Sequence, residues 1–158
     1  MYKIEPISKK YREFVDKQIA DGWAGPFIVT KGVLHDTRTH PGFAAIRDDI
    51  VSGYILYNLA DQELEITVLE SLQERQGVGN ALVKSVIQEA QKAGLRRVWL
   101  ISTNDNTHAI RFYQRIGFSL RAVHIDAIKT SRKLKPEIPL TGYDGISIAH
   151  EFEFEMFV

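Results

Sequence analysis

The chain has 158 residues, in which 20 lysines and arginines balance 20 aspartates and glutamates and cysteine is absent. One compact domain over residues 1–158 suits this length, and the balanced charge disfavours binding to DNA or RNA through bulk electrostatics. The lack of cysteine excludes disulfides, thiolate metal sites and a cysteine nucleophile. Because the sequence has neither an apolar run of about 18 residues nor a signal-peptide pattern, we expect a cytoplasmic protein with no membrane partner.

The first part of the chain alternates short strands with one helix. The residue pattern predicts a strand over residues 2–7, a helix over residues 10–20, and a hairpin of residues 42–47 and 50–58 joined by two aspartates. Residues 21–41 hold several glycines and prolines, too many for one regular element. Long irregular segments of compact domains are often functional, so this segment is a candidate part of a binding site.

The later part continues the alternation. Residues 63–69 alternate polar and apolar side chains and are rich in β-branched ones, which predicts a strand. Apolar residues then recur at helical spacing from Ala81 to Ala90, and Gly94 ends that run. The remaining elements are predicted as a strand over residues 97–101, a helix of about three turns ended by Gly117, a strand over 118–125, a helix over 126–134 and a strand over 146–157.

A glycine turn lies where the strand of residues 63–69 leads into the next helix. The first N–H groups of a helix have no internal partner and its dipole is positive there, so the main chain alone can hold a phosphate. Gly77 and Gly79 leave room for that approach. No Gly-Lys-Ser/Thr follows, which excludes a nucleotide P-loop, and the third glycine of a dinucleotide fingerprint would fall at Leu82. A purely structural turn is the alternative.

A second block of residues follows about 25 positions further on. After a strand come Asp105 and Asn106, either of which can cap a helix. In that helix Ala109, Phe112 and Tyr113 share the inner side, and a glycine ends it. The sequence therefore repeats the order of strand, turn and helix.

Together the two blocks resemble the GNAT superfamily of N-acetyltransferases. The resemblance rests on Gln76-Gly77-Val78-Gly79-Asn80-Ala81-Leu82 and on Asn106-x-x-Ala109-x-x-Phe112-Tyr113-x-x-Ile116-Gly117-Phe118, and its clear part covers roughly residues 42–125. It implies an α/β (α+β) fold with a mixed, mostly antiparallel central sheet that is splayed at the middle, and helices on both faces. Acetyl-CoA, as cosubstrate, would be wedged between the strand before the glycine turn and the strand after it.

The resemblance also implies which residues contact the coenzyme. The expected set is Val68, Leu69, Arg75, Gln76, Gly77, Val78, Gly79, Asn80, Ala81, Asn104, Asn106 and Tyr113. Asn106 matches the family asparagine, whereas Asn104 is included by proximity and is favoured as a helix cap. The family usually has Arg or Gln three residues before the first glycine; Glu74 stands there, so a side-chain contact from that position is in doubt.

The reaction implied is direct transfer of an acetyl group from a thioester to an amine, which needs a base, an oxyanion donor and an acid. Tyr113 matches the family's general acid, and a phenol with a reference pKa of about 10 is protonated at neutral pH. A main-chain N–H near Val68 or Leu69 would hold the oxyanion, which requires a bulge or a splayed strand. Glu65 is the expected base, with Glu63 or a chain of waters as alternatives, and solvated carboxylates at these positions are the non-catalytic reading.

The histidines do not form a metal-binding pattern. His35 and His40 flank a loop without a nearby third histidine, and no H-E-x-x-H motif exists. Ser52 also lacks the surroundings of a nucleophile elbow. We therefore expect no metal and no hydrolytic serine.

Of the features of the reaction, the identity of the acceptor is the one that the sequence determines least. In this family the variable N-terminal region and the late strands build its pocket, which here points to Trp23, Phe27, His35, Tyr54, Tyr57, His124, Glu151, Glu153 and Glu155. Aromatic and acidic side chains suit a cationic amine, although alternating glutamates are also typical of a half-exposed strand, which is favoured, or of a sheet edge.

The sequence thus predicts an acetyl-CoA-dependent N-acetyltransferase that acts on a small-molecule amine such as an antibiotic, a polyamine or an amino-acid derivative. Acetylation of protein amino groups, transfer of longer acyl chains, and a non-catalytic module that binds acetyl-CoA or CoA as a sensor remain as alternatives. The long last strand also allows a homodimer paired through the late strands.

Overall fold

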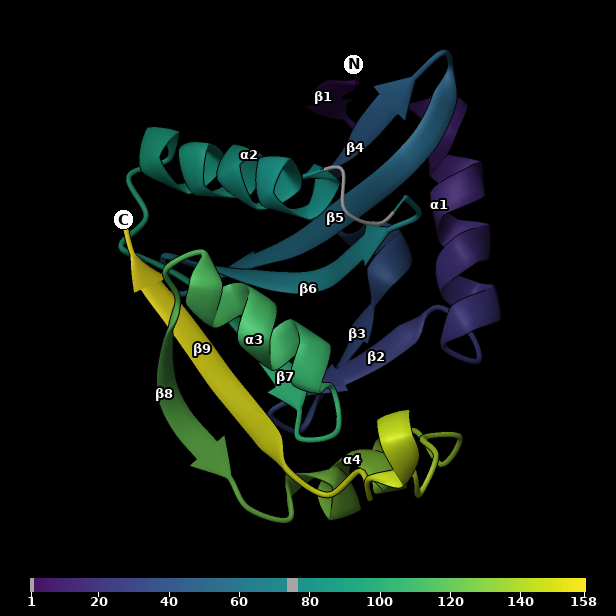
Figure 1. Cartoon of the computed structure of the whole chain (residues 1–158), viewed down its shortest axis with the longest axis vertical. Helices are drawn as coiled ribbons and strands as arrows, with labels where there is room; N and C mark the ends of the chain where they lie inside the picture. Colours follow the sequence, from purple (N-terminus) through teal and green to yellow (C-terminus); the bar gives the residue numbers. More distant parts are fainter. Residues whose placement is uncertain (1, 74–76) are drawn as a thin grey trace.

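The computed structural model describes residues 2–73 and 77–158 (Figure 1). Its strands and helices are β1 Lys3–Pro6, α1 Lys9–Gly22, β2 Phe27–Thr30, β3 Val33–Asp36, β4 Gly42–Arg47, β5 Ile50–Ala60, β6 Glu63–Ser71, α2 Val78–Lys92, β7 Arg97–Thr103, α3 Thr107–Arg115, β8 Ser119–His124, α4 Ala127–Leu134 and β9 Glu151–Phe157. No helix in these ranges has the length and apolar character needed to cross a bilayer.

Seven strands form one sheet in the order β1-β4-β5-β6-β7-β9-β8. Every neighbouring pair is antiparallel except β6 and β7, which run parallel. One apolar cluster joins this sheet to α2 and α3, and a second joins it to α1, so helices cover both faces (Figure 1). The mixed, mostly antiparallel sheet expected from the sequence is confirmed.

The sheet opens between β6 and β7. These strands pair only where residues 63–66 of β6 meet residues 97–100 of β7. Beyond that point β6 runs on to Ser71 beside β5, while β7 runs on to Thr103 beside β9. Within the described residues the facing backbone edges of the two strands therefore diverge, which is the splay that the sequence predicts.

A β-bulge interrupts β6 where this opening begins. Leu56 of β5 pairs with Val68 and Tyr57 pairs with Ile66, so Thr67 is an extra residue with no partner across the pair. A bulge reverses which face the following side chains occupy. Ile66 accordingly packs in the cluster under α2, whereas Val68 packs in the cluster under α1.

The glycine-rich segment before Gly42 contains a small hairpin. β2 and β3 pair antiparallel through a turn at Lys31 and Gly32, which both have positive φ values, of 48° and 74°. Two such residues match the twist of a two-residue hairpin. The glycines and prolines that argue against one long element are therefore compatible with two short strands joined by a turn.

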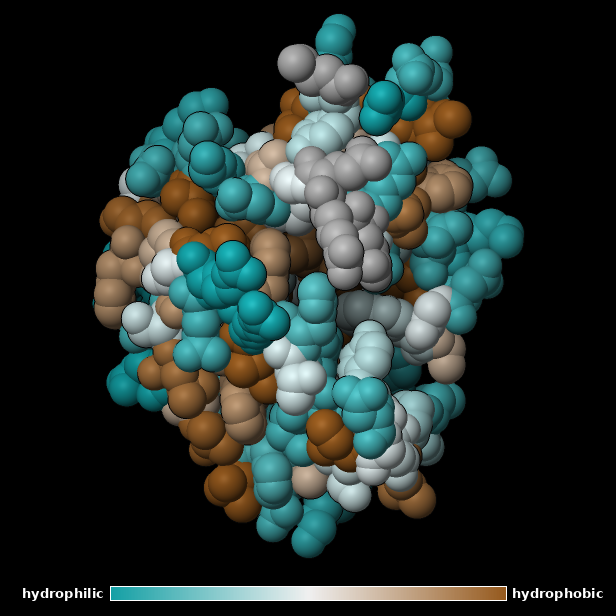
Figure 2. Space-filling view, in the orientation of Figure 1, coloured by the Kyte–Doolittle hydropathy of each residue, from teal (hydrophilic) through white to brown (hydrophobic). Residues whose placement is uncertain are grey.

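The predicted last strand begins later than expected and is not an edge. β9 starts at Glu151 and lies between β7 and β8, so β8 is the strand at that end of the sheet. Figure 2 shows hydrophobic atoms along the side where Figure 1 places β8, and Leu120, Val123 and Ile125 are exposed there. Pairing of two copies through the late strands stays a prediction, and β8 is the strand that would carry it.

Candidate active site

The glycine turn leads directly into α2. Gly77 occupies the N-cap position with φ of 72°, and no side chain among the described residues caps the helix there. Among the described residues, a Cβ added to Gly77 would meet only the Tyr2 hydroxyl, at 3.6 Å, whereas one added to Gly79 would lie 3.3 Å from the Phe112 ring of α3. The main chain is thus open at Gly77 and closely packed at Gly79. Of the expected coenzyme contacts, Arg75 and Gln76 lie outside the described residues, as does Glu74.

This arrangement suits a long ligand with phosphates at one end. The first amides of α2 can receive anions, and the diverging edges of β6 and β7 leave backbone groups for an amide-bearing chain. Val68 and Leu69 lie on the β6 side of that opening, one and two residues beyond the bulge at Thr67. The turn thus follows the strand that borders the opening, which is where the sequence analysis expects CoA.

Tyr113 lies on the inner side of α3 and is buried. Its ring makes edge contacts with Phe112 and Phe118, at centroid distances of 5.1 and 5.5 Å. Burial raises the pKa of its phenol above the ordinary value of 10.0, because the charged form would lose its hydration. Tyr113 therefore keeps its proton at neutral pH, as its expected role of acid requires.

The two asparagines before α3 have different structural roles. Asn106 caps the helix by accepting a hydrogen bond from the Ala109 N–H at 3.1 Å. Asn104 does not cap it, so that prediction is wrong. Its amide binds the chain before β9, donating to the Ser147 carbonyl and accepting from the N–H groups of Ala149 and His150, each at 2.9 Å. These bonds hold residues 147–150 against the end of β7, just before β9 begins.

Glu65 is a buried carboxylate on β6, only 4% exposed. The Thr30 hydroxyl donates a hydrogen bond to its Oε2 at 2.7 Å, and the His35 Nε2 lies 3.6 Å from its Oε1. Burial raises the pKa of Glu65 to about 7, even though the hydrogen bond from Thr30 opposes that rise. The reading of Glu65 as a solvated carboxylate is wrong, and a pKa near neutrality is what a general base needs.

Glu63, the reserve choice for the base, has different surroundings. Its carboxylate lies 3.5 Å from a guanidinium nitrogen of Arg96 and 3.3 Å from one of Arg97. These two guanidinium groups hold the Glu63 carboxylate in ion pairs. Glu65, in contrast, has no lysine or arginine ion-pair partner among the described residues.

A pair of histidines, His35 partly buried and His40 buried, connects Glu65 with the bulge, and the sequence analysis did not predict this pairing. His35 contacts Glu65, its ring lies 5.4 Å from that of His40, and the His40 Nδ1 lies 2.8 Å from the Thr67 hydroxyl. Burial lowers the pKa of both imidazoles, that of His40 to about 4, so both are neutral at pH 7. No sequence motif marks these residues, because they meet only through the hairpin β2–β3.

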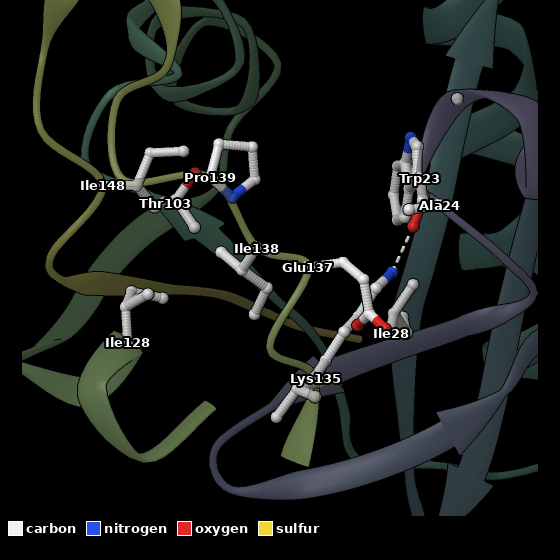
Figure 3. Close-up of a pocket in the computed structure, with 12 residues that line it drawn as sticks. Trp23, Ala24, Ile28, Thr103, Ile128, Lys135, Glu137, Ile138, Pro139 and Ile148 are labelled. Carbon is white, nitrogen blue, oxygen red and sulfur yellow. Dashed lines mark hydrogen bonds between the residues drawn. The ribbon is translucent and has the colours of Figure 1, made fainter. Parts of the chain in front are cut away.

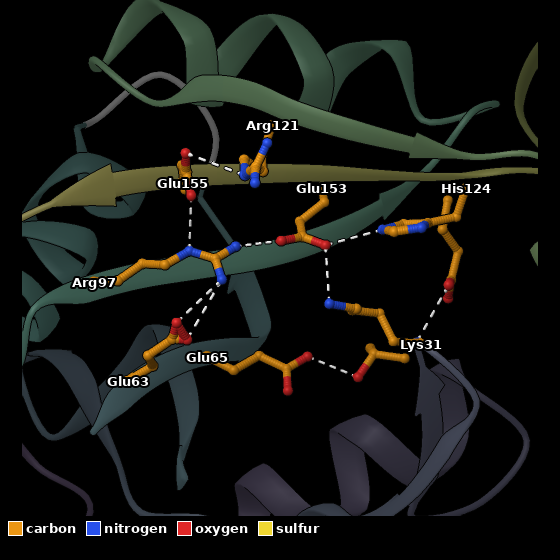
Figure 4. A network of polar contacts seen from close by, with 10 residues as sticks. Lys31, Glu63, Glu65, Arg97, Arg121, His124, Glu153 and Glu155 are labelled. Carbon is orange, nitrogen blue, oxygen red and sulfur yellow. Dashed lines mark hydrogen bonds and ion pairs between the residues drawn. The ribbon is translucent and has the colours of Figure 1, made fainter. Parts of the chain in front are cut away.

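The glutamates of β9 form a buried ionic network with basic residues (Figure 4). Glu153 contacts Arg97, Lys31 at 3.1 Å and His124 at 2.9 Å. Burial acts to raise the pKa of Glu153, but the hydrogen bonds from these residues outweigh it and lower the pKa to about 2. The reading of these glutamates as the polar face of a half-exposed or edge strand is therefore wrong.

Glu151, at the start of β9, is buried without such a pairing. It is 1% exposed and accepts a hydrogen bond from the Lys31 N–H at 3.2 Å, while no lysine or arginine side chain in the described ranges forms an ion pair with it. Burial raises its pKa. Glu151 and Glu65 thus lie under the same hairpin turn, held by Lys31 and Thr30 respectively.

A cavity of about 310 Å³ opens beside β2 of this hairpin (Figure 3). It lies between the connection from α1 to β2, helix α4, and the segment after α4. Trp23, one of the residues expected to bind the acceptor, lines it, whereas Tyr54 and Tyr57 are buried in the two core clusters. Within the described residues no group of three or more histidine, aspartate or glutamate side chains is placed to hold a metal ion.

Comparison with known proteins places these features in a family. Residues 8–118 match the sequence profile of the Acetyltransferase (GNAT) family. The protein YdhI of Bacillus subtilis, described as uncharacterized, is 34% identical over 155 residues, which cover 98% of this chain and 97% of YdhI.

Solved structures of the same fold cover the whole chain. A Bacillus subtilis acetyltransferase in complex with CoA superposes with a TM-score of 0.74 at 19% identity, over 100% of this chain and 99% of that one. The ribosomal-protein-S18-alanine N-acetyltransferase of Escherichia coli gives a TM-score of 0.67 at 15% identity, over 100% and 94%.

Proposed function

Because the chain belongs to the acetyltransferase (GNAT) family and is an N-acetyltransferase, we propose that it transfers the acetyl group of acetyl-CoA to a primary amine of a small molecule. The observation that carries this proposal is Glu65, a buried carboxylate with a pKa near neutrality, two residues before the bulge where the sheet opens. A base at that point reaches an amine on one side of the opening while the thioester occupies the other.

Each task of the reaction then has a residue. Acetyl-CoA supplies the acetyl group in activated form, as a thioester. Glu65 accepts a proton from the acceptor ammonium, and the neutral nitrogen attacks the carbonyl carbon. A main-chain N–H at Val68 or Leu69 stabilises the oxyanion, and Tyr113 gives its proton to the sulfur when the C–S bond breaks. The attacking nitrogen loses its second proton as the amide forms, and that proton restores the Tyr113 phenol.

The coenzyme contacts follow the same geometry. The amides from Gly77 to Ala81, with Arg75 and Gln76 before them, would hold the pyrophosphate, and Asn106 would meet the pantetheine arm while it caps α3. We assign Asn104 a structural role instead, because its amide is bound to residues 147–150.

A protein amino group is the second candidate acceptor, since one protein of the same fold acts on the alanine of a ribosomal protein. A small molecule is favoured because the candidate acceptor site is an open pocket of only about 310 Å³, at the lower end of small-molecule sites.

Release of CoA thiol tests the proposal directly. A thiol reagent can report it without background, because the chain has no cysteine. We expect thiol release that depends on both acetyl-CoA and an amine, that falls at least about 100-fold in Glu65→Gln, and that persists in Glu63→Gln. Equal rates in Glu65→Gln and the wild type would remove Glu65 from the mechanism.

A further inference from the structure

We propose that the acceptor is a primary amine carried on a single compact apolar body, and that this body binds in the cavity beside the β2–β3 hairpin. The inference rests on the proposed function and specifies its substrate class. It excludes polyamines and other polycations, which a family of amine acetyltransferases could otherwise accept.

The walls of the cavity are predominantly apolar. Its lining includes six large apolar or proline residues: Trp23, Ile28, Ile128, Ile138, Pro139 and Ile148 (Figure 3). Its volume of about 310 Å³ is at the lower end of small-molecule sites, which span roughly 300–1,000 Å³. A compact hydrocarbon or aromatic group would bury the most apolar surface against these walls and so contribute most to the binding free energy.

Lys135, the cationic residue in the cavity lining, is already hydrogen-bonded to the main chain. Lys135 donates hydrogen bonds to the carbonyls of Trp23 and Phe27, the latter at 2.6 Å (Figure 3). Trp23 is the C-cap of α1, where a positive charge compensates the helix dipole. Lys135 therefore ties α4 to the end of α1. The acceptor therefore needs no anionic group to neutralise the charge of Lys135.

Two residues of the cavity lining, Ile28 and Thr103, are near neighbours of residues that contact or pair with two carboxylates. Along β2, Ile28 and Thr30 are buried on the same face; Ile28 lines the cavity and Thr30, about 7 Å further along, binds Glu65. On the sheet side Thr103 lines the cavity, and its register partner across the pair is Glu151. An amine attached to a body in the cavity can thus meet Glu151, which attracts its ammonium form, and Glu65, which takes its proton.

The remaining carboxylates on this face are not available for further ammonium groups. Glu153 is bound by three basic side chains, and Glu155 contacts Arg97 at 2.8 Å and Arg121 at 3.9 Å (Figure 4). Glu63 is held by two arginines. Glu137, the carboxylate in the cavity lining itself, interacts electrostatically with the neighbouring Lys135. Among the described carboxylates of this face, those that form no ion pair with a lysine or arginine are Glu65 and Glu151, which suits a monoamine.

Binding can be measured without turnover. The wild-type protein, saturated with CoA so that no acetyl transfer occurs, is titrated calorimetrically with 2-phenylethylamine, with isoamylamine and with spermidine. Ile138→Lys places a like charge at the wall of the cavity. Leu140→Lys is the matched control, because Leu140 is in the same segment, is 74% exposed and does not line the cavity.

We expect saturable binding of the two apolar amines, weakened about tenfold or more by Ile138→Lys and unchanged by Leu140→Lys, with spermidine weaker than both. The inference is overturned if neither apolar amine binds, if spermidine binds more tightly, or if the two lysine variants behave alike. Acetyl-CoA with each amine then tests the proposed function separately. Thiol release with spermidine but with neither apolar amine rejects the acceptor class alone, whereas bound amine without any thiol release rejects acetyl transfer.

Discussion

The Thr30 hydroxyl lies 2.7 Å from Glu65 Oε2, although 35 positions separate the two residues in the chain. This hydrogen bond places the turn of the β2–β3 hairpin over the middle of the sheet, next to the point where β6 and β7 diverge. A segment outside the family's two sequence blocks therefore sets the protonation of the residue that we assign as the base.

Removing that hydroxyl should change the pH dependence of the enzyme. Thr30 stabilises the charged form of Glu65 and so lowers its pKa; in Thr30→Val the pKa should rise above its present value of about 7. The acidic limb of the kcat/KM profile should move to higher pH by about one unit. Thr30→Ser, which keeps the donor, should leave the limb in place, and an unshifted limb in Thr30→Val would exclude Thr30 from this role.

Glu65 should lower the stability of the folded protein above neutral pH. Its pKa is raised from 4.5 to about 7 on folding, so its contribution favours the folded state below pH 4.5 and is lost as the pH rises through 7. Glu65→Gln should therefore unfold with a free energy on the order of 3 kcal/mol higher than the wild type at pH 8, and with a similar free energy at pH 4.5. Urea unfolding at both pH values measures this difference.

The same measurement on Glu63→Gln provides the contrast. Glu63 is paired with Arg96 and Arg97, so its loss should not stabilise the protein at pH 8. A Glu65→Gln variant that is less stable than the wild type at pH 8 would contradict the buried, proton-exchanging carboxylate described above.

The bulge in β6 should depend on the hydrogen bond between His40 and Thr67. Thr67→Val leaves the buried imidazole of His40 without its partner, at a cost of about 1–3 kcal/mol in unfolding free energy. It should also loosen the strand that presents the Val68 N–H, lowering kcat about tenfold with little change in the KM for acetyl-CoA. Thr67→Ser retains the hydroxyl and should recover most of both losses; equal effects of serine and valine would rule out the hydrogen bond as the cause.

Tyr113→Phe should separate chemistry from binding. The phenyl ring keeps the edge contacts with Phe112 and Phe118, so the fold and the affinity for acetyl-CoA should change little. Loss of the hydroxyl should lower kcat about 100-fold, within the usual contribution of a general acid. Rapid-quench measurement of a single turnover would report the chemical step, and a normal rate there would show that another group protonates the sulfur.

Local sequence patterns were sufficient to predict the elements that carry the acetyl donor. The glycine turn at the start of α2, a cap at Asp105 or Asn106 and the alternation of β6 depend on neighbouring residues, and the structure has Gly77 and Asn106 as the caps. The sheet type followed from the family resemblance. The contribution of residues 21–41 could not be predicted in the same way, because Thr30, His35 and His40 acquire their roles only from contacts with a distant strand.

The burial of the β9 glutamates likewise could not be predicted from local sequence patterns. Alternation along β9 correctly separates its two faces, yet it cannot tell which face is buried or whether a further strand lies outside it. Glu151 and Glu153 are buried because the β2–β3 hairpin covers them and because Arg97, Lys31 and His124 neutralise Glu153. Strand order and charge partners are tertiary properties, so the predictions of an exposed face and an edge strand failed together.

Calorimetric titration of acetyl-CoA into the wild type, Gly77→Trp and Gly94→Trp tests the central claim most directly. The two glycines lie at opposite ends of α2 with similar φ values, of 72° and 69°, so both substitutions impose similar backbone strain, and circular dichroism confirms that each variant is folded. We predict binding to the wild type and to Gly94→Trp and its loss in Gly77→Trp. Binding that survives in a folded Gly77→Trp, or a wild type that does not bind acetyl-CoA, would contradict the assignment of this turn and of the acetyl donor.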